Sequence, residues 1–231
     1  MAYPRKLPFI AALALVPVFV GAEVAGLPLL PVSERIVYAR TIGDKSEEVV
    51  VLTRLVSSKD GAWYELTMHS PDQDSLYRLD TRTLFANYAQ TTIRSKESTI
   101  RRVTEVLEER SAAGADEILL PGIDSLPYSL RAFDWGSRQK AKIRFLGTVG
   151  GSDFRFGLDV AGKESIVTPK GEVVCWKVQI SLDGVLGSFF GKSSLWYSVD
   201  FPHYLVKSEG SSAGPGSPQS VLTLVSYSAG S

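Results

Sequence analysis

Few residues of this chain combine the types and the spacing that catalysis requires. The 231-residue sequence holds one cysteine, Cys175, and two histidines, His69 and His203. Cys175 and His203 would form a nucleophile and base pair only if their strands were neighbours and both side chains shared a face. The alternative is a small side chain within a sheet and a histidine that opens a strand after Pro202. We expect this alternative, and we predict no catalytic residue and no enzymatic activity.

The metal-ligating and acidic residues are equally scattered. Two histidines and one cysteine without close spacing do not make a structural zinc site. The turn at 71–75 lacks the ladder of oxygen ligands and the glycine of an EF-type calcium loop. Nothing in the sequence places two carboxylates opposite each other, as glycosidase chemistry requires, among Glu47, Glu48, Glu105, Glu108, Glu109 and Asp116. We predict no metal site and no cofactor.

The aromatic residues are the remaining candidates for binding. The chain holds 4 tryptophans, 10 phenylalanines and 9 tyrosines, many for a sheet with one convincing helix to cover it. A curved sheet fills its interior with such rings or holds an apolar partner there. Core packing is one interpretation, and an apolar groove is the other. For a groove, we expect the lining or rim to be formed by Trp63, Phe154, Phe156, Trp176, Phe189, Phe190 and Trp196.

The N-terminus has the pattern of a secretory signal. Arg5 and Lys6 precede an almost entirely apolar run over 7–20, and small residues follow at 21–22. The run is shorter than the roughly 20 residues that cross a bilayer comfortably. We therefore predict a cleaved signal peptide at 1–22, a single exported domain at 23–231, a periplasmic or otherwise exported location, and no transmembrane anchor after cleavage. Retention of the segment as an anchor is the alternative.

The charge balance limits the partners that we expect, and the cysteine content limits the covalent bonds. Lysine plus arginine and aspartate plus glutamate are 25 each, so no basic field exists to attract nucleic acid. We therefore do not expect nucleic acid as a partner. A lone cysteine forms no intrachain disulfide, so stability must come from the core.

Alternating apolar and polar residues predict strands along most of the chain. Val174, Trp176 and Val178 alternate with Cys175 and Lys177, as expected for an antiparallel strand with one buried face. Residues 87–110 also fit a helical stripe, but their β-branched content favours strands. One short helix is predicted at 124–135, with an Asp or Ser cap and a proline in its first turn. The expected fold is mainly β: a curved, largely antiparallel sheet that forms a half-barrel or open barrel.

Several short motifs resemble an exported bacterial family, the domain of unknown function 3108. They are Leu-Pro-Tyr-Ser-Leu-Arg-Ala-Phe-Asp-Trp at 126–135, a Thr-Pro-Lys-Gly turn at 168–171, the cysteine-bearing strand after it, and the tryptophan strand with an Asp-Phe-Pro kink at 195–202. The resemblance covers roughly 35–228. It implies a curved antiparallel sheet outside the cytoplasm and carries no activity, cofactor or catalytic residue. A weaker analogy of fold links the chain to periplasmic lipoprotein carriers of the Lol type.

These observations lead to one functional expectation and one alternative. We expect a non-enzymatic protein that binds an apolar or amphipathic partner, such as lipid or a lipoprotein, in the concave face of its sheet. The alternative is a structural or assembly protein of the cell envelope that acts through contacts with another protein. An open cavity between the sheet and 124–135 would favour the first.

Overall fold

Alternating side chains and short turns place most of this chain in antiparallel strands. The computed structural model describes residues 29–59, 61–95, 97–105, 117–121, 125–145, 154–183, 191–211 and 218–230. The predicted signal peptide at 1–22 lies outside these residues. No helix among the described residues is long and apolar enough to cross a membrane.

Two runs of consecutive strands build one 13-stranded sheet. The first run comprises β1 (Ser33–Ile42), β2 (Lys45–Ser58), β3 (Gly61–His69), β4 (Gln73–Asp80), β5 (Ala86–Arg94) and β6 (Thr99–Glu105). The second comprises β7 (Glu117–Leu120), β8 (Lys140–Phe145), β9 (Phe154–Thr168), β10 (Gly171–Leu182), β11 (Ser193–Ser198), β12 (Leu205–Ser211) and β13 (Gln219–Gly230). Within the ambiguous region at 87–110, the described residues form the strands β5 and β6 with a short connection between them, and none of them is helical.

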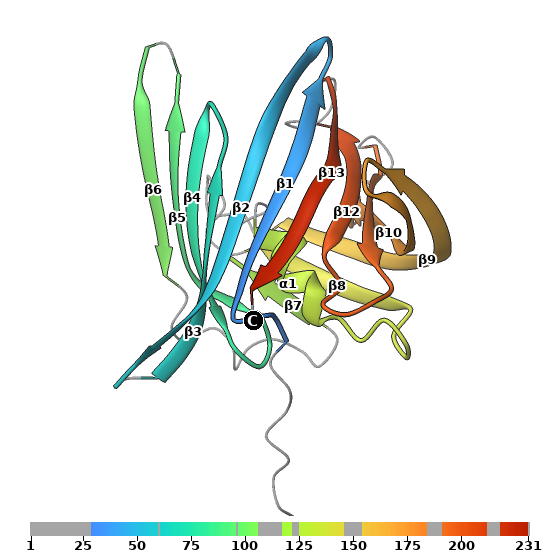
Figure 1. The fold of residues 1–231 in the computed structure, drawn as a ribbon, viewed down its shortest axis with the longest axis horizontal. Coiled ribbons are helices and arrows are strands. Elements are labelled where there is room, and N and C mark those ends of the chain that lie inside the picture. Colours follow the sequence, from blue (N-terminus) through green and yellow to red (C-terminus); the bar gives the residue numbers. More distant parts are fainter. Residues whose placement is uncertain are drawn as a thin grey trace, which may run out of the picture.

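The two runs meet where β1 pairs with β13. The sheet order is β6-β5-β4-β3-β2-β1-β13-β12-β11-β10-β9-β8-β7, so the first and last strands form a seam in the middle. In this antiparallel seam Ile36 lies opposite Tyr227. Figure 1 shows that the sheet curves, and its end strands β6 and β7 do not pair with each other. The predicted fold, a curved and largely antiparallel sheet that stays open, is confirmed.

One pair of strands departs from the antiparallel pattern. β7 runs parallel to β8, with Ile118 opposite Ile143. Parallel neighbours require a crossover connection, and the chain between these two strands contains the helix. Residues 125–135 are called the crossover segment below.

The helix in the crossover segment is shorter than the predicted range of 124–135. The α-helix α1 covers Leu126–Ser129, and a 3-10 turn continues over Leu130–Ala132. A proline occupies the first turn as predicted, but Ser125 makes no side-chain capping bond.

The helix ends early because the aromatic residues after it pack on the sheet. Phe133 has an extended backbone, with ψ at 139°. Its ring meets Trp135 edge-on at 5.0 Å, and Trp135 lies 4.9 Å from the ring of Tyr197 on β11. Another helical turn would carry both rings away from these contacts, so tertiary packing overrides helix propensity here.

The crossover segment defines two faces of the sheet. We call the face that it contacts the inner face, and the opposite one the outer face. Tyr77 of β4 lies 5.9 Å from Tyr128 of α1, and Tyr197 meets Trp135. Side chains directly opposite on paired strands share a face, and successive residues alternate. Tyr77 and Tyr197 therefore lie on the inner face, and the face of every strand residue in register with them follows.

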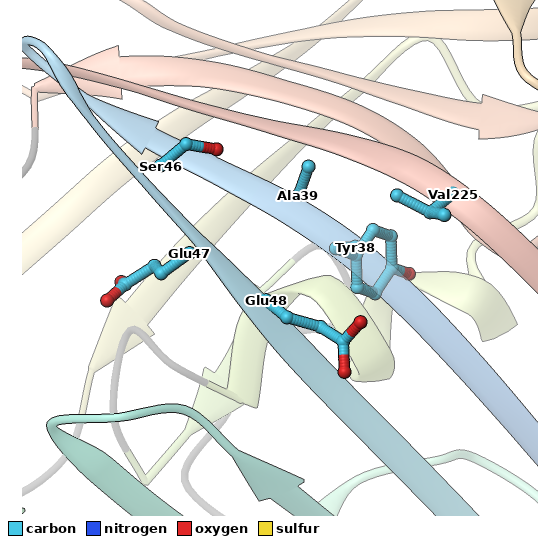
Figure 2. A pocket seen from close by; sticks show the side chains of 6 residues that line it. All are labelled: Tyr38, Ala39, Ser46, Glu47, Glu48 and Val225. Carbon is cyan, nitrogen blue, oxygen red and sulfur yellow. The ribbon is translucent and has the colours of Figure 1, made fainter.

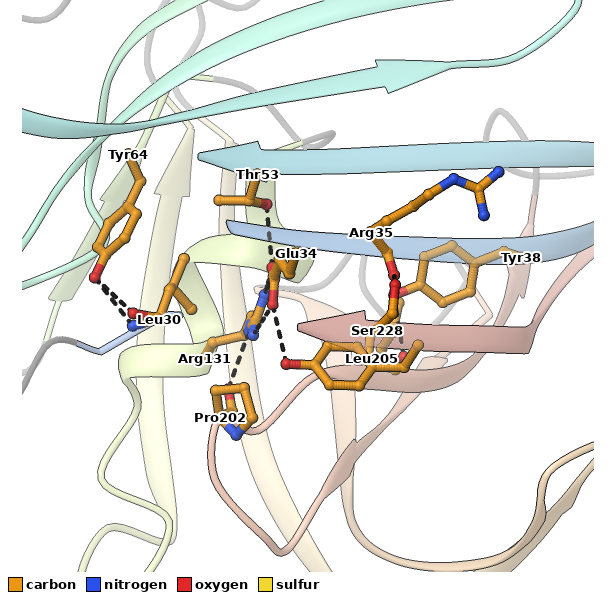
Figure 3. Close-up of polar contacts among 11 residues, drawn as sticks. Leu30, Glu34, Arg35, Tyr38, Thr53, Tyr64, Arg131, Pro202, Leu205 and Ser228 are labelled. Atoms are coloured by element: carbon orange, nitrogen blue, oxygen red, sulfur yellow. Dashed lines mark hydrogen bonds and ion pairs between the residues drawn. The ribbon is translucent and has the colours of Figure 1, made fainter. Parts of the chain in front are cut away.

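A buried ion pair fixes the crossover segment to the seam (Figure 3). Arg131 donates from Nη1 and Nη2 to the two carboxylate oxygens of Glu34 on β1, the second contact at 3.0 Å. Its Nε donates to the carbonyl of Pro202 at 3.1 Å. The Arg131 and Glu34 side chains are 1% and 0% exposed. Burial alone would lower the pKa of Arg131, but the adjacent carboxylate more than offsets this and raises it, so the guanidinium stays charged.

Neighbouring hydroxyls complete the environment of the carboxylate. Thr53 Oγ1 on β2 donates to Glu34 Oε1 at 3.1 Å, and the Tyr227 hydroxyl on β13 donates to Oε2 at 3.4 Å. Glu34 thus binds side chains from both strands beside β1 and from the crossover segment. An ion pair whose polar atoms are all hydrogen-bonded in this way can be buried at little cost. Removal of one of its two partners leaves the other charge buried and uncompensated.

Loss of one partner of this pair should destabilise the protein strongly. Arg131→Met leaves the Glu34 carboxylate buried without its cation. We expect this substitution to lower the free energy of unfolding, measured in urea, by about 3–5 kcal/mol. The control is Lys140→Met, which removes the cation of a solvent-exposed ion pair. In this pair the side chains of Lys140 and Asp159 are 82% and 53% exposed. We expect the control substitution to change stability by about 0.5 kcal/mol or less. Equal effects of the two substitutions would contradict a structural role for the buried pair.

Candidate functional site

An apolar strip lies on the inner face at one end of the β9–β10 hairpin. Trp176 of β10 lies opposite Tyr197 of β11, and so shares the face on which Trp135 packs. Val174 precedes Trp176 by two residues and points the same way, with 52% of its surface exposed. On β9, Val167 shares this face by register and is 81% exposed. Val167, Val174 and Trp176 are called the apolar strip.

The strip continues the buried aromatic core toward solvent. Trp135 and Tyr197 are buried, at 3% and 0% exposure, while Trp176 beside Tyr197 is only partly buried and packs against this core. Apolar side chains this exposed gain free energy when a partner covers them. The strip is therefore an accessible extension of the core rather than a part of it.

Charged groups flank the strip. Lys163 of β9 lies opposite Trp176, and its Nζ is 4.1 Å from the centroid of the indole ring. This is a cation–π contact that keeps the ammonium on the inner face. Glu172 lies opposite Val167 near the hairpin turn. An apolar centre with a charged border suits an amphipathic partner.

Three of the residues expected to line a groove belong to neighbouring strands at this side of the sheet. Trp176 is part of the strip. Phe156 is partly buried and meets Phe145 edge-on at 5.1 Å, which places it in the packed part of the inner face. Phe154 opens β9 opposite Phe145. Phe189 and Phe190 lie outside the described residues.

The other two expected residues lie on the outer face. On β3, Leu66 lies opposite Tyr77 and therefore on the inner face, and so does Tyr64, two residues before it. Trp63 is adjacent to Tyr64 and points to the outer face. Trp63 instead faces Arg78, whose guanidinium carbon is 5.5 Å from the indole centroid. The structure thus does not bring Trp63 together with Trp176.

Trp196 is separated from the inner face in the same way. It alternates with Tyr197 on β11 and is 4% exposed. Lys177 and Lys207 lie over its ring at 5.0 Å and 5.1 Å, and its Nε1 donates to Glu164. This enclosure by charged side chains makes Trp196 a packed residue of the outer face.

The space between the sheet and the crossover segment is filled. Rings of Tyr77, Tyr128, Trp135 and Tyr197 occupy it together with the buried ion pair. Leu130 at the centre of the segment is 0% exposed. The inner face under the crossover segment is therefore core, and only the inner face beyond it can meet a partner.

A shallow depression of about 290 Å³ lies over β1 and β2 (Figure 2). It is lined by Tyr38, Ala39, Ser46, Glu47, Glu48 and Val225. Glu47 and Glu48 are consecutive in β2 and point in different directions, so they do not form a carboxylate pair. Glu47 is instead bound by Arg40. The depression offers no arrangement of reactive groups.

The single thiol and the second histidine make separate contacts. Cys175 is buried on the outer face, where its Sγ donates to the carbonyl of Val173 at 3.4 Å. Burial, reinforced by the nearby Glu164 carboxylate, raises the pKa of the Cys175 thiol to about 12. His203 has its Nδ1 at 3.0 Å from the carbonyl of Ser198 and lies near the ring of Trp135. Neither of these contacts joins the two side chains to each other.

The carboxylates of the acidic turn at 71–75 are bound by basic side chains. Asp72 accepts from Arg40 at 2.7 Å, and Asp74 binds His69 at 2.9 Å and Arg94. Throughout the described ranges, no three of His, Cys, Asp and Glu lie together as metal ligands would.

Comparison with known proteins finds likeness only among solved structures. No family model and no curated protein matches the chain. A beta-barrel-like protein of domain of unknown function DUF1849 from Brucella abortus is 9% identical, with 87% of this chain and 98% of that chain covered and a TM-score of 0.46. The hypothetical lipoprotein YmcC from Escherichia coli is 9% identical, with 87% and 89% covered and a TM-score of 0.38. The LolA superfamily protein NE2245 from Nitrosomonas europaea is 9% identical, with 89% and 88% covered and a TM-score of 0.32.

Similarity at this level carries no function over to this chain. The resemblance to domain of unknown function 3108 stays a prediction from the motifs.

The thiol of Cys175 should react only after unfolding. The pKa of Cys175 is about 12 in the native protein, against an ordinary 9.0, so the fold favours the neutral thiol. The stability that depends on the neutral thiol is therefore fully present below pH 9 and is lost as the pH rises toward 12. Since the thiolate is the nucleophile, we expect iodoacetamide at pH 8 to label the native protein about 10³-fold more slowly than the urea-unfolded protein. Val167→Cys combined with Cys175→Ser gives an exposed thiol as the control and should label at the rate of a free peptide. Rapid labelling of native Cys175 would contradict its burial and reopen a nucleophilic role.

Proposed function

We propose that this chain is an exported protein that binds an acyl chain, from a lipid or from the lipid anchor of a lipoprotein, on the inner face of its sheet. The observation that carries the proposal is the apolar strip, in which Val167 and Val174 are 81% and 52% exposed beside the half-buried Trp176. Valine and tryptophan surfaces of this kind gain about 25 cal/mol for each Å² of apolar surface that a partner covers.

The space between the sheet and the crossover segment is filled, so the open cavity that would favour this function is missing there and a partner would bind on the surface of the inner face. The crossover segment fills the middle of the inner face, so an acyl chain would lie along the strands beyond that segment. A further exposed ring follows close by in the chain: Phe201 is 60% exposed, two residues after Val199, whose amide donates to the carbonyl of Val174 at 2.9 Å. Lys163 beside Trp176 is positioned to contact a polar or anionic group at the end of an acyl chain.

Lipid should accompany the protein from the cell. When the protein is produced in bacteria with export intact and purified without detergent, solvent extraction followed by mass spectrometry should recover acyl lipid at a fixed ratio to protein. A protein that carries no lipid and does not bind a fluorescent fatty acid, 11-dansylaminoundecanoic acid, would contradict the proposal.

Binding should depend on one face of the sheet. We expect Val174→Asp to weaken binding of the dansyl fatty acid about tenfold or more, because it places a charge where the apolar chain would lie. Since Val174 is 52% exposed, this change does not disturb the core. Trp176→Ser should weaken binding similarly, while Trp63→Ser, a tryptophan truncation on the outer face, should change it less than twofold. Equal binding by all three variants would show that the fatty acid binds elsewhere.

A further inference from the structure

Among the strands that the structure describes, β6 is an unpaired edge of the sheet. In the sheet order β6 is the terminal strand, hydrogen-bonded only to β5, and no other described strand lies beyond it. Figure 1 shows β6 standing at the border of the sheet. The backbone donors and acceptors of such an edge form a template on which an extended segment can add as a further strand.

Two of the usual protections of an edge strand, a proline and a bulge, are missing from β6. Its seven residues, Thr99–Glu105, contain no proline, glycine or lysine. Its ladder with β5 runs from Thr99 opposite Arg94 to Glu105 opposite Tyr88 without a bulge. Its two apolar residues are well exposed, Ile100 at 47% and Val103 at 49%. A regular edge with exposed β-branched residues is suited to accept a strand.

Two arginines at the centre of β6 set the chemistry of the partner. Arg101 and Arg102 are consecutive, so one lies on each face, and both are exposed. Arg101 donates to the neutral amide of Gln90 at 2.6 Å. No carboxylate among the described residues pairs with either guanidinium. The edge is therefore locally basic in a chain whose formal net charge is zero.

The same arginines disfavour a second copy of this strand. Antiparallel pairing of two β6 strands about their centre would place Arg102 opposite Arg102, or Arg101 opposite Arg102. Like charges directly opposite each other destabilise a strand pair. An acidic segment would instead gain a cross-strand ion pair on each face.

We propose that the β6 edge binds an extended segment of another protein, with two adjacent acidic residues flanked by β-branched apolar residues. The acidic residues lie opposite Arg101 and Arg102, and the apolar ones lie opposite Ile100 and Val103. This pattern of apolar, acidic, acidic and apolar residues reads the same in both directions, so it fits parallel and antiparallel addition. The surface is distinct from the apolar strip and does not depend on acyl-chain binding.

A peptide of this pattern tests the proposal on the full protein. The probe is fluorescein-labelled Thr-Thr-Val-Glu-Glu-Val-Thr-Thr, and its binding is followed by fluorescence anisotropy and by hydrogen exchange of the β6 amides. We expect binding that slows exchange in β6. We also expect a peptide with lysines in place of the two glutamates to bind about tenfold more weakly, and the preference to reverse in the Arg101→Glu, Arg102→Glu variant.

Two controls separate strand addition from other outcomes. The glutamate peptide methylated at alternate backbone nitrogens keeps its charges but cannot complete the ladder, and it should lose binding at least tenfold. Equal binding of the glutamate and lysine peptides, or no protection of β6, would overturn the proposal. Protection of β6 that rises with protein concentration without peptide would also overturn it, because the edge would then be an interface between copies of this chain.

Discussion

The buried pair between Glu34 and Arg131 is the constraint on which the arrangement of this sheet depends. Glu34 lies on β1, at the seam between the two runs of strands, and also binds side chains of β2 and β13. Arg131 brings the crossover segment to that seam and reaches the turn at Pro202 as well. One carboxylate therefore ties together parts of the chain that are far apart in sequence. Because both charges are almost fully buried, each requires the other.

Fixing the crossover segment in this way divides the inner face into a closed and an open part. Beneath the segment, Trp135 and Tyr128 pack on rings of the sheet and fill the space between the two. Beyond it, Trp176 and Val174 continue the same face with no described element over them. The position of the apolar strip is thus a consequence of where the ion pair holds the crossover segment. A chain with the same strands but an unanchored segment would expose a different part of the face.

Strand positions were predictable from the sequence because alternation is a local property. The faces of the candidate residues were not, because a face is defined only by what covers it. Trp63, Trp176 and Trp196 look equivalent as aromatic residues in strands, yet register places only Trp176 beside the crossover segment. The ion pair joins residues 97 positions apart, a distance over which no periodicity or spacing carries a signal. Val174 and Val167 were missed as well, since an exposed valine in a strand has no local mark that distinguishes it from a buried one.

The apolar strip and the β6 edge differ in the physics of the contacts that they offer. The strip belongs to the second run of strands and the edge to the first, with the seam between them, so a partner at one need not displace a partner at the other. Contacts at the edge include charges at the surface, which salt screens over a Debye length of about 8 Å at physiological ionic strength. Burial of apolar surface at the strip is not screened in this way, and salts such as sulfate strengthen it. Rising ionic strength would therefore separate the two proposed interactions: it should weaken the binding of an acidic strand at the edge but not the binding of an acyl chain at the strip.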